Sequence, residues 1–212
     1  MKNDALTVPL GPERIEIVVV NSRFIASLDY VQNVEEARDF IAHIRGEFPD
    51  ASHHVPAFII GGGNSKTEFC SDDGEPSGTS GRPLLAVLRG SGLGDAAIVV
   101  SRYFGGTLLG TGGLVKAYSE AGRLVLEKTR RAALVEFSRL RLDLPYGLFE
   151  SFRRLAVDSD AGIAEEKFEE NVHMIVEVPS GSLDQFRSRL ADLSSGSVEV
   201  RIVGTSMARR AL

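Results

Sequence analysis

Residues 139–155 read RLRLDLPYGLFESFRRL. In the first part of this stretch, leucines at 140, 142 and 144 alternate with charged residues, which predicts a β-strand with one buried face. Pro145 ends that pattern, and the apolar residues that follow recur at the spacing of an amphipathic helix: Leu148, Phe149, Phe152 and Leu155. The change of period predicts a strand followed directly by a helix.

The remaining C-terminal sequence extends this pattern. Apolar and β-branched runs at 163–168 and 172–178 predict two strands, separated by a polar turn at 169–171. Apolar residues spaced along 183–193 predict a second helix, and alternation at 198–202 predicts a last strand. The order β-α-β-β-α-β is that of the ferredoxin-like fold. We place a domain boundary near 132–136, which divides the chain into domains 1–134 and 135–212.

The N-terminal part also mixes strands and helices, so the fold class is α+β. Alternation predicts strands at 13–20 and 24–30, and Asn33 followed by Glu36 predicts a capped helix that ends at Gly46. Apolar runs predict strands at 55–60 and 96–100, with a turn at 61–64 and a return strand at 67–70. We expect short and long helices at 84–89 and 111–128, and no regular structure at 71–83 because of its Gly and Pro content.

The composition excludes several classes of protein. The 212 residues are 43% hydrophobic and 25% charged, the balance of a globular protein with one or two domains. Lys and Arg number 24 against 29 Asp and Glu, so the net charge of −5 excludes a globally basic nucleic-acid-binding protein but not a local basic patch. The single cysteine, Cys70, excludes an intramolecular disulfide and a cysteine-based zinc site. No apolar run reaches about 18 residues and residues 1–11 lack a secretory signal pattern, so we expect a cytoplasmic protein.

Residues 102–113 form a glycine-rich segment between a predicted strand and a predicted helix. The segment matches neither the phosphate loop G-x-x-x-x-G-K-[ST] nor the dinucleotide fingerprint. Free amides at the helix start, with Arg102 before them and Lys116 in the first turns, are suited to holding an anion. The candidate phosphate-binding residues of this segment are Arg102, Gly105, Gly106, Thr111, Gly112, Gly113 and Lys116. The alternative is that the glycines only allow a tight crossover between strand and helix.

A second candidate is the acidic loop that contains Asp72, Asp73 and Glu75, with His53 nearby in the sequence. Carboxylates and an imidazole are suited to binding a divalent metal or to acid–base catalysis. The alternative is architectural, because carboxylates commonly cap backbone amides in loops of this composition. Ser77 and Thr79 add hydroxyl groups to the same loop, but no nucleophile-elbow motif surrounds them. We expect no metal and no cofactor.

Two segments carry a family resemblance. Residues 72–83 (DDGEPSGTSGRP) and 99–110 (VVSRYFGGTLLG) closely resemble the two long motifs of the IMPACT/YigZ family. Residues 22–26 and 52–55 are similar to the shorter motifs of that family, and the likeness extends over about 22–130. Ser80 and Arg82 stand where the family also uses Ala and Lys, which are mild departures. The C-terminal part resembles the small ferredoxin-like domain that bacterial members carry.

The resemblance implies a fold and a biological setting. It implies a first domain of the left-handed βαβ type, as in a small-subunit ribosomal protein and in domain IV of the translocase elongation factor, and a second domain like domain V of that factor. By fold-level analogy this points to translation. Eukaryotic relatives act in translational control through an additional N-terminal domain, by competing for the ribosome-associated coactivator of a starvation-sensing kinase.

From these observations we hypothesise a monomer that binds RNA or the ribosome and regulates translation. The two motif loops are expected to lie together, with Arg82, Arg102 and Lys116 neutralising phosphate and the acidic loop shaping the site. One alternative is an enzyme that acts on a phosphorylated small molecule or nucleotide through Asp72, Asp73 and Glu75. Another is an interaction module for a translation factor.

Overall fold

The structure is a computed structural model that describes residues 5–63 and 65–212, so Asn64 of the predicted turn lies outside the described residues. The chain forms two compact units. Of the described residues, the first unit comprises 5–63, 65–133 and 209–212, and the second comprises 134–208. Both units combine strands and helices, so the protein is a two-domain α+β protein.

The first unit contains a five-stranded antiparallel sheet with the strand order β2-β3-β6-β4-β5. Its strands are β2 (Glu13–Val19), β3 (Ser22–Tyr30), β4 (His53–Gly62), β5 (Ser65–Cys70) and β6 (Ala96–Tyr103). The central strand β6 pairs with β3 on one side and with β4 on the other. The segment β3-α1-β4 is therefore a βαβ crossover with a strand inserted between its two strands.

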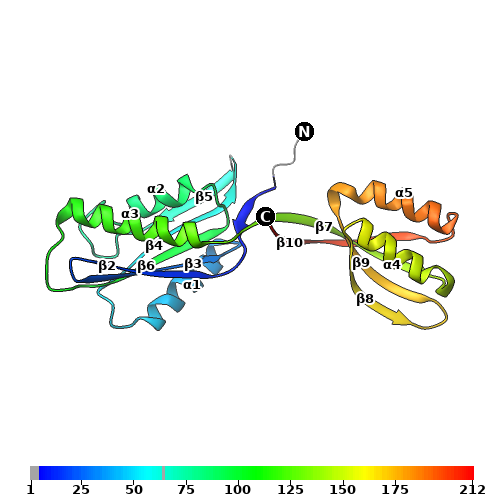
Figure 1. Ribbon diagram of the computed structural model, residues 1–212, viewed down its shortest axis with the longest axis horizontal. Coiled ribbons are helices and arrows are strands. Elements are labelled where there is room, and N and C mark those ends of the chain that lie inside the picture. The colour runs from blue at the N-terminus through cyan, green and yellow to red at the C-terminus, as the bar shows by residue number, and fades with distance from the viewer. Residues whose placement is uncertain (1–4, 64) are drawn as a thin grey trace. The chain divides into compact units, whose positions relative to one another are not determined.

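Helices cover both faces of this sheet (Figure 1). Helix α1 (Val34–Glu47) lies on one face, where Ala37 packs with Phe58 and Ala97. Helices α2 (Gly81–Gly90) and α3 (Gly110–Lys128) lie on the other face, over a larger core that includes Phe24, Ile98 and Tyr118. The motif loops flank the helices of this second face, because one precedes α2 and the other precedes α3.

Two helix starts illustrate where local sequence is sufficient and where it misleads. The predicted cap of α1 is confirmed, since Asn33 Oδ1 accepts a hydrogen bond from Glu36 N at 2.9 Å and Glu36 Oε2 accepts one from Gln32 N. The prediction of no regular structure through residue 83 was wrong, because α2 begins at Gly81 and includes Pro83. Proline is tolerated there because the first amides of a helix have no intrahelical acceptor.

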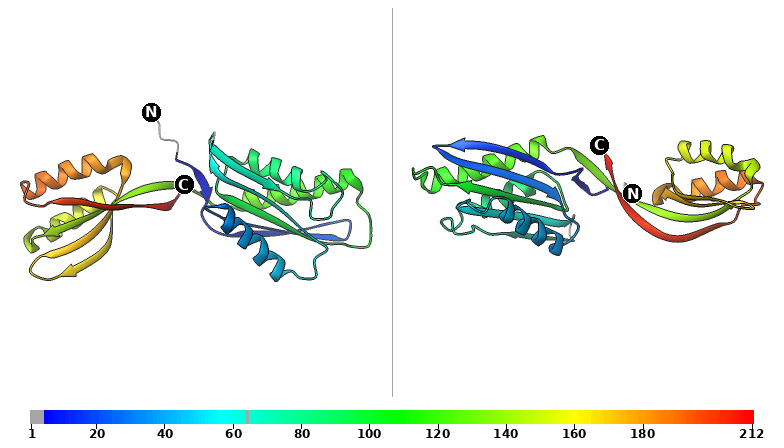
Figure 2. Two further views of the ribbon diagram at one scale, coloured as in Figure 1. Left: turned by 180° about the vertical axis from the view of Figure 1, so that it is seen from behind. Right: turned by 90° about the horizontal axis from the view of Figure 1, so that it is seen from below.

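The second unit has the ferredoxin-like strand order β10-β7-β9-β8. Its elements are β7 (Arg131–Leu144), α4 (Phe149–Asp158), β8 (Gly162–Phe168), β9 (Val172–Pro179), α5 (Leu183–Ser194) and β10 (Val200–Ala211), with short 3-10 turns at Tyr146–Leu148 and Ser180–Ser182. Helices α4 and α5 cover one face of the sheet (Figure 2). Phe152 and Phe186 meet edge to face at 6.3 Å in a core that draws on the second unit alone. Within the described residues, no helix is both long and apolar enough to cross a bilayer.

Two features of the first unit extend beyond the sequence prediction. Strand β1 (Thr7–Pro9) pairs with residues 131–133 of β7. Strand β10 continues past the predicted residue 202, and its last residues belong to the first unit, where the Arg209 guanidinium lies 4.5 Å from the centroid of the Tyr30 ring. The chain therefore crosses between the units twice, once in β7 and once in β10.

We propose that a fragment of residues 1–136 folds by itself, because both apolar clusters of the first unit lie within it. It loses the Arg209–Tyr30 contact and the 3.0 Å hydrogen bond from Leu212 N to Arg131 O, which should cost about 1–2 kcal/mol. Circular dichroism and calorimetry should show a folded fragment with a slightly lower Tm than the same unit in the full chain. An insoluble or unfolded fragment would mean that the two units share a core.

Candidate functional site

The acidic loop and the glycine-rich segment meet at a buried ion pair. Glu75 Oε1 accepts hydrogen bonds from Arg102 Nη1 at 2.7 Å and from the Tyr118 hydroxyl at 2.8 Å. The side chains of Glu75 and Arg102 are 3% and 6% exposed. Burial together with the Glu75 carboxylate raises the pKa of Tyr118, so its hydroxyl stays protonated and donates. The expected proximity of the two motif loops is therefore present in the structure.

Arg102 lies on β6, the strand between β3 and β4. In the register of β6, Arg102 stands opposite Phe24 on β3 and opposite His53 on β4. Its guanidinium lies 5.4 Å from the centroid of the Phe24 ring and 5.6 Å from that of Phe104, and Nη2 donates to Ser22 Oγ at 3.3 Å. Arg102 Nε is buried and has no hydrogen-bond partner among the described residues.

This burial changes the role that the sequence suggested for Arg102. The sequence suggested a cation that neutralises phosphate, whereas only 5% of the residue is exposed and its charge is paired with Glu75. A buried charge needs such a partner because removal from water is costly. A phosphate contact at Arg102 stays a prediction, and it requires a ligand that enters the cavity described below.

The other two carboxylates of the acidic loop point to different donors. Asp72 accepts hydrogen bonds from the amides of Gly78, Ser80 and Gly81, and from the Ser80 hydroxyl. Burial raises the pKa of Asp72, but these hydrogen bonds outweigh burial and leave the pKa below its ordinary value. Asp72 thus organises the loop and the start of α2.

The Asp73 carboxylate forms an ion pair with the Arg45 guanidinium at 2.5 Å and accepts a hydrogen bond from the amide of His54 at 2.6 Å. The three carboxylates therefore diverge. Within residues 5–63 and 65–212, no group of three His, Cys, Asp or Glu side chains is placed to hold a metal ion. Asp72 and Asp73 both accept hydrogen bonds from backbone amides, as an architectural role of the acidic loop requires.

In the glycine-rich segment, Gly105 is required because the backbone at Asn21 lies very close to it. A Cβ atom on Gly105 would lie 2.2 Å from the carbonyl carbon of Asn21, so no side chain fits there. The Gly105 amide donates to Ser22 Oγ at 3.2 Å, the hydroxyl that also accepts from Arg102. Gly106 and Gly110 adopt positive φ angles of 80° and 71°, a region in which residues with a Cβ atom are rarely found. These glycines shape the turn into α3.

The first backbone amides of helix α3 have no side-chain acceptor nearby in the sequence. No described side chain caps its first turn, and that turn contains no acidic residue. The first amides of a helix have no intrahelical acceptor and carry a partial positive charge. Thr111 and Gly112 are exposed there and Gly113 is half-buried, so the start of α3 retains the character of an anion site.

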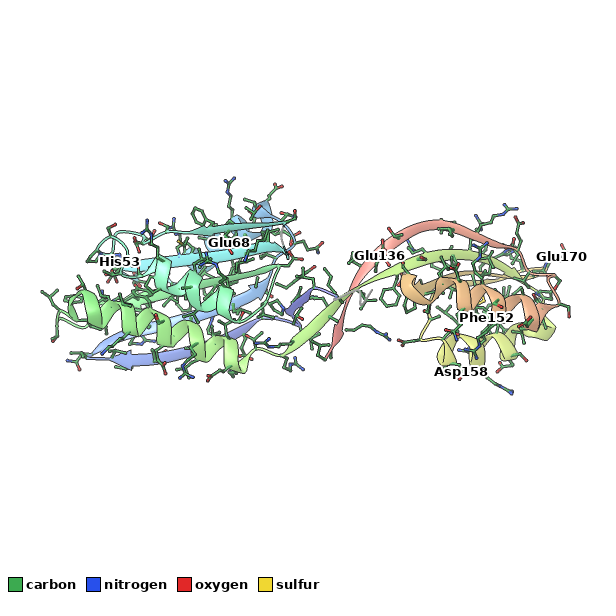
Figure 3. The ribbon with its side chains drawn as sticks, turned by 90° about the horizontal axis from the view of Figure 1, so that it is seen from above. His53, Glu68, Glu136, Phe152, Asp158 and Glu170 are labelled. Carbon is green, nitrogen blue, oxygen red and sulfur yellow. The ribbon has the colours of Figure 1, made fainter. Side chains whose placement is uncertain are left out.

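A cavity of about 460 Å³ joins the ion pair to the start of α3. Its polar lining comes from His53, Glu75, Arg102 and Thr111, and its apolar lining comes from Pro76, Phe104, Leu108, Leu109 and Leu114. His53, labelled in Figure 3, is the first residue of β4. Its Nδ1 lies 2.8 Å from the carbonyl oxygen of Asp73 and its Nε2 lies 4.0 Å from Glu75 Oε1. The cavity therefore has a charged floor and an apolar rim.

The remaining candidates are not all brought to this cavity. Lys116 is exposed on α3 but borders a separate depression with Val87 and Arg123. Arg82 is exposed in the first turn of α2, and Ser77 is exposed in the acidic loop. Thr79 is buried, and its hydroxyl donates to the carbonyl oxygen of Pro76 at 2.6 Å, which gives it a structural role.

Two site residues were missed from the sequence. Tyr118 lies in the apolar stripe of α3, and because a buried tyrosine hydroxyl usually requires a partner, it could have signalled one. Ser22 was noted only as part of a short motif, yet its hydroxyl joins Arg102 to Gly105. No spacing rule connects Ser22 to residues about 80 positions away.

Comparison with known proteins gives consistent matches. Residues 20–126 match the family model described as "Impact N-terminal domain", and residues 142–197 match "Domain of unknown function (DUF1949)". The chain is 36% identical to an "IMPACT family member" of Haemophilus influenzae, covering 92% of this chain and 96% of that protein. It is also 36% identical to "IMPACT family member YigZ" of Escherichia coli, covering 91% and 95%. A solved structure, "Crystal structure of an hypothetical protein", is 36% identical with a TM-score of 0.63, covering 95% of this chain and 98% of that one.

Proposed function

Because this chain belongs to the IMPACT family, we propose that it binds RNA, free or within the ribosome, and regulates translation in the cytoplasm. The binding surface is the end of the first unit where the two motifs meet. Family resemblance supplies the link to translation. The side chains and amides where the acidic loop meets the glycine-rich segment support the choice of RNA as the ligand.

The observation that carries the proposal is the exposed rim of the cavity. Phe104 and Leu108 line the cavity and are 47% and 87% exposed. An exposed aromatic ring offers a stacking surface for a base. The adjacent amides at the start of α3 offer hydrogen bonds to a phosphate. This combination of a stacking surface and an anion site suits a nucleic-acid strand.

Two exposed cations are available for further phosphates. Arg82 and Lys116 take part in no ion pair among the described residues, unlike five other exposed arginines of the first unit. Each contact between a cation and a phosphate releases counterions, so it makes affinity depend on salt. The local charge can thus attract RNA although the whole chain is acidic.

The direct test is co-sedimentation with ribosomes on a sucrose gradient at two salt concentrations, with and without nuclease. We expect the protein to travel with ribosomes or polysomes at low salt, and to shift to the top of the gradient at high salt or after nuclease. Co-sedimentation that survives nuclease would favour the alternative of an interaction module for a translation factor. Absence from all ribosomal fractions, together with no binding to free RNA, would overturn the proposal.

A variant series separates stacking from phosphate contacts. Phe104→Ala should weaken binding of a single-stranded RNA by about 1–3 kcal/mol at every salt concentration. Arg82→Ala and Lys116→Ala should each reduce the slope of log K against log salt by about 0.7. Arg123→Ala is the matched control, because Arg123 is exposed but already paired with Glu120 and Glu127. A slope that changes equally in all three arginine and lysine variants would argue against specific phosphate contacts.

A further inference from the structure

We infer that the cavity between the acidic loop and the start of α3 holds a single nucleotide, with its phosphate on the α3 amides and its base at Glu75. This deepens the proposed function by naming the element of RNA that is read, a terminal or unstacked nucleotide. It also predicts binding of the free mononucleotide, which is tested independently of RNA.

The anion end of the cavity is the first turn of α3. Gly110 and Thr111 line the cavity, and the turn lacks both a side-chain cap and an acidic residue. A long helix such as this one carries a partial charge of about +0.5 at its N-terminus. Arg102 lines the same cavity and brings a buried positive charge to it, and its Nε has no hydrogen-bond partner among the described residues.

The opposite end of the cavity presents hydrogen-bond acceptors. His53 Nδ1 lies 2.8 Å from the Asp73 carbonyl oxygen, which can only accept, so the proton of a neutral ring is on Nδ1 and Nε2 is an acceptor. The Glu75 carboxylate has about four acceptor positions, of which Arg102 and Tyr118 occupy two. A ligand that fits this floor must bring adjacent donors. Guanine does so, since its Watson–Crick edge carries the N1 and N2 protons.

The dimensions agree with a mononucleotide. The cavity extends along the first turns of α3, since Gly110, Thr111 and Leu114 all line it together with Glu75. The volume of about 460 Å³ lies within the range of small-molecule sites, and Phe104, Leu109 and Leu114 supply apolar walls for the base and ribose.

Isothermal titration of the full chain with three probes tests the assignment of both ends. We expect GMP to bind at least tenfold more tightly than inorganic phosphate, which meets only the α3 end. AMP should also bind at least tenfold more weakly than GMP, because adenine presents an acceptor at N1 where the floor requires a donor. Equal affinity for GMP and AMP would overturn the role of Glu75 and His53 in reading the base.

Matched variants locate the site. Thr111→Glu places a negative charge in the first turn of α3, which favours the helix but repels phosphate, so GMP affinity should fall at least tenfold in a folded protein. Thr107→Glu makes the same charge change on an exposed residue of the loop that does not line the cavity, and it should change GMP affinity less than twofold. His53→Phe should lower the preference for GMP over AMP while leaving phosphate binding unchanged.

Parallel binding of a single-stranded RNA distinguishes the inference from the proposed function. RNA binding without GMP binding would overturn the nucleotide site and leave the RNA proposal standing. GMP binding without RNA or ribosome binding would overturn the RNA proposal and leave the nucleotide site standing. GMP binding that is unaffected by Thr111→Glu would place the nucleotide elsewhere and overturn the site assigned here.

Discussion

Replacing Glu75 with glutamine should lower the stability of the first unit by about 3–5 kcal/mol, on the scale measured for broken buried ion pairs. The substitution preserves shape and one acceptor oxygen, but it leaves the Arg102 guanidinium charged, 95% buried and without a carboxylate partner. Calorimetry of the full chain is the suitable measurement, because two compact units need not unfold in one transition. The transition of the first unit should fall by on the order of 10 °C.

Two controls show whether the buried pair causes this loss. Glu16→Gln breaks the exposed ion pair with Arg23, and it should cost less than about 1 kcal/mol. The double variant Glu75→Leu, Arg102→Met removes both buried charges, so it should be more stable than Glu75→Gln. A Glu75→Gln protein with unchanged stability would show that Arg102 finds compensation elsewhere, and the ion pair would not be the centre of the site.

Replacing Asp72 with alanine should cost roughly 2–4 kcal/mol, the second-largest effect that we expect. The change removes the acceptor for the amides of Gly78, Ser80 and Gly81. Losing a helix cap lowers the stability of the fold, and so does leaving buried amides without a hydrogen-bond partner. Thermal unfolding should show the loss, and Asp39→Asn, which removes an exposed carboxylate from α1, should stay within about 0.5 kcal/mol of the original.

The Asp72 carboxylate is also expected to contribute to the loss of folding stability at acid pH. Because its pKa is lower in the folded protein than in the unfolded chain, its contribution is fully present above about pH 4, the unfolded value. That contribution is lost as the pH falls through the folded pKa. The stability difference between the original protein and Asp72→Ala should therefore be largest near pH 6 and should shrink below pH 4. A difference that is constant from pH 6 to pH 3 would contradict the ionised cap.

Local patterns in the sequence were sufficient for two features that depend on neighbours along the chain. The cap of α1 joins residues three apart, and the ferredoxin-like order follows from alternating strand and helix periods. Pro83 misled because a breaker inside a helix is tolerated in its first turn, which composition alone does not reveal.

The composition of the candidate site depended on tertiary contacts. Glu75 joins residues 27 and 43 positions away, and the sequence contains no local pattern that pairs them. Lys116 was placed on α3 correctly, but the packing of the helix turns it towards a depression with Val87 rather than towards the cavity. The sequence suggested Arg102 as a cation for phosphate, and the register of β6 between β3 and β4 buries it.

The physical reason for this division is the range of the interactions. Helix and strand periods reflect which face of a short segment is buried, so they can be read from residues within one or two turns of each other. Partner choice for a buried charge, and the return of Arg209 to Tyr30 from the far end of the chain, arise only when distant segments pack together. The motifs could therefore be recognised from the sequence, whereas the pairing of Arg102 with Glu75, and with it the cavity, required the packed first unit.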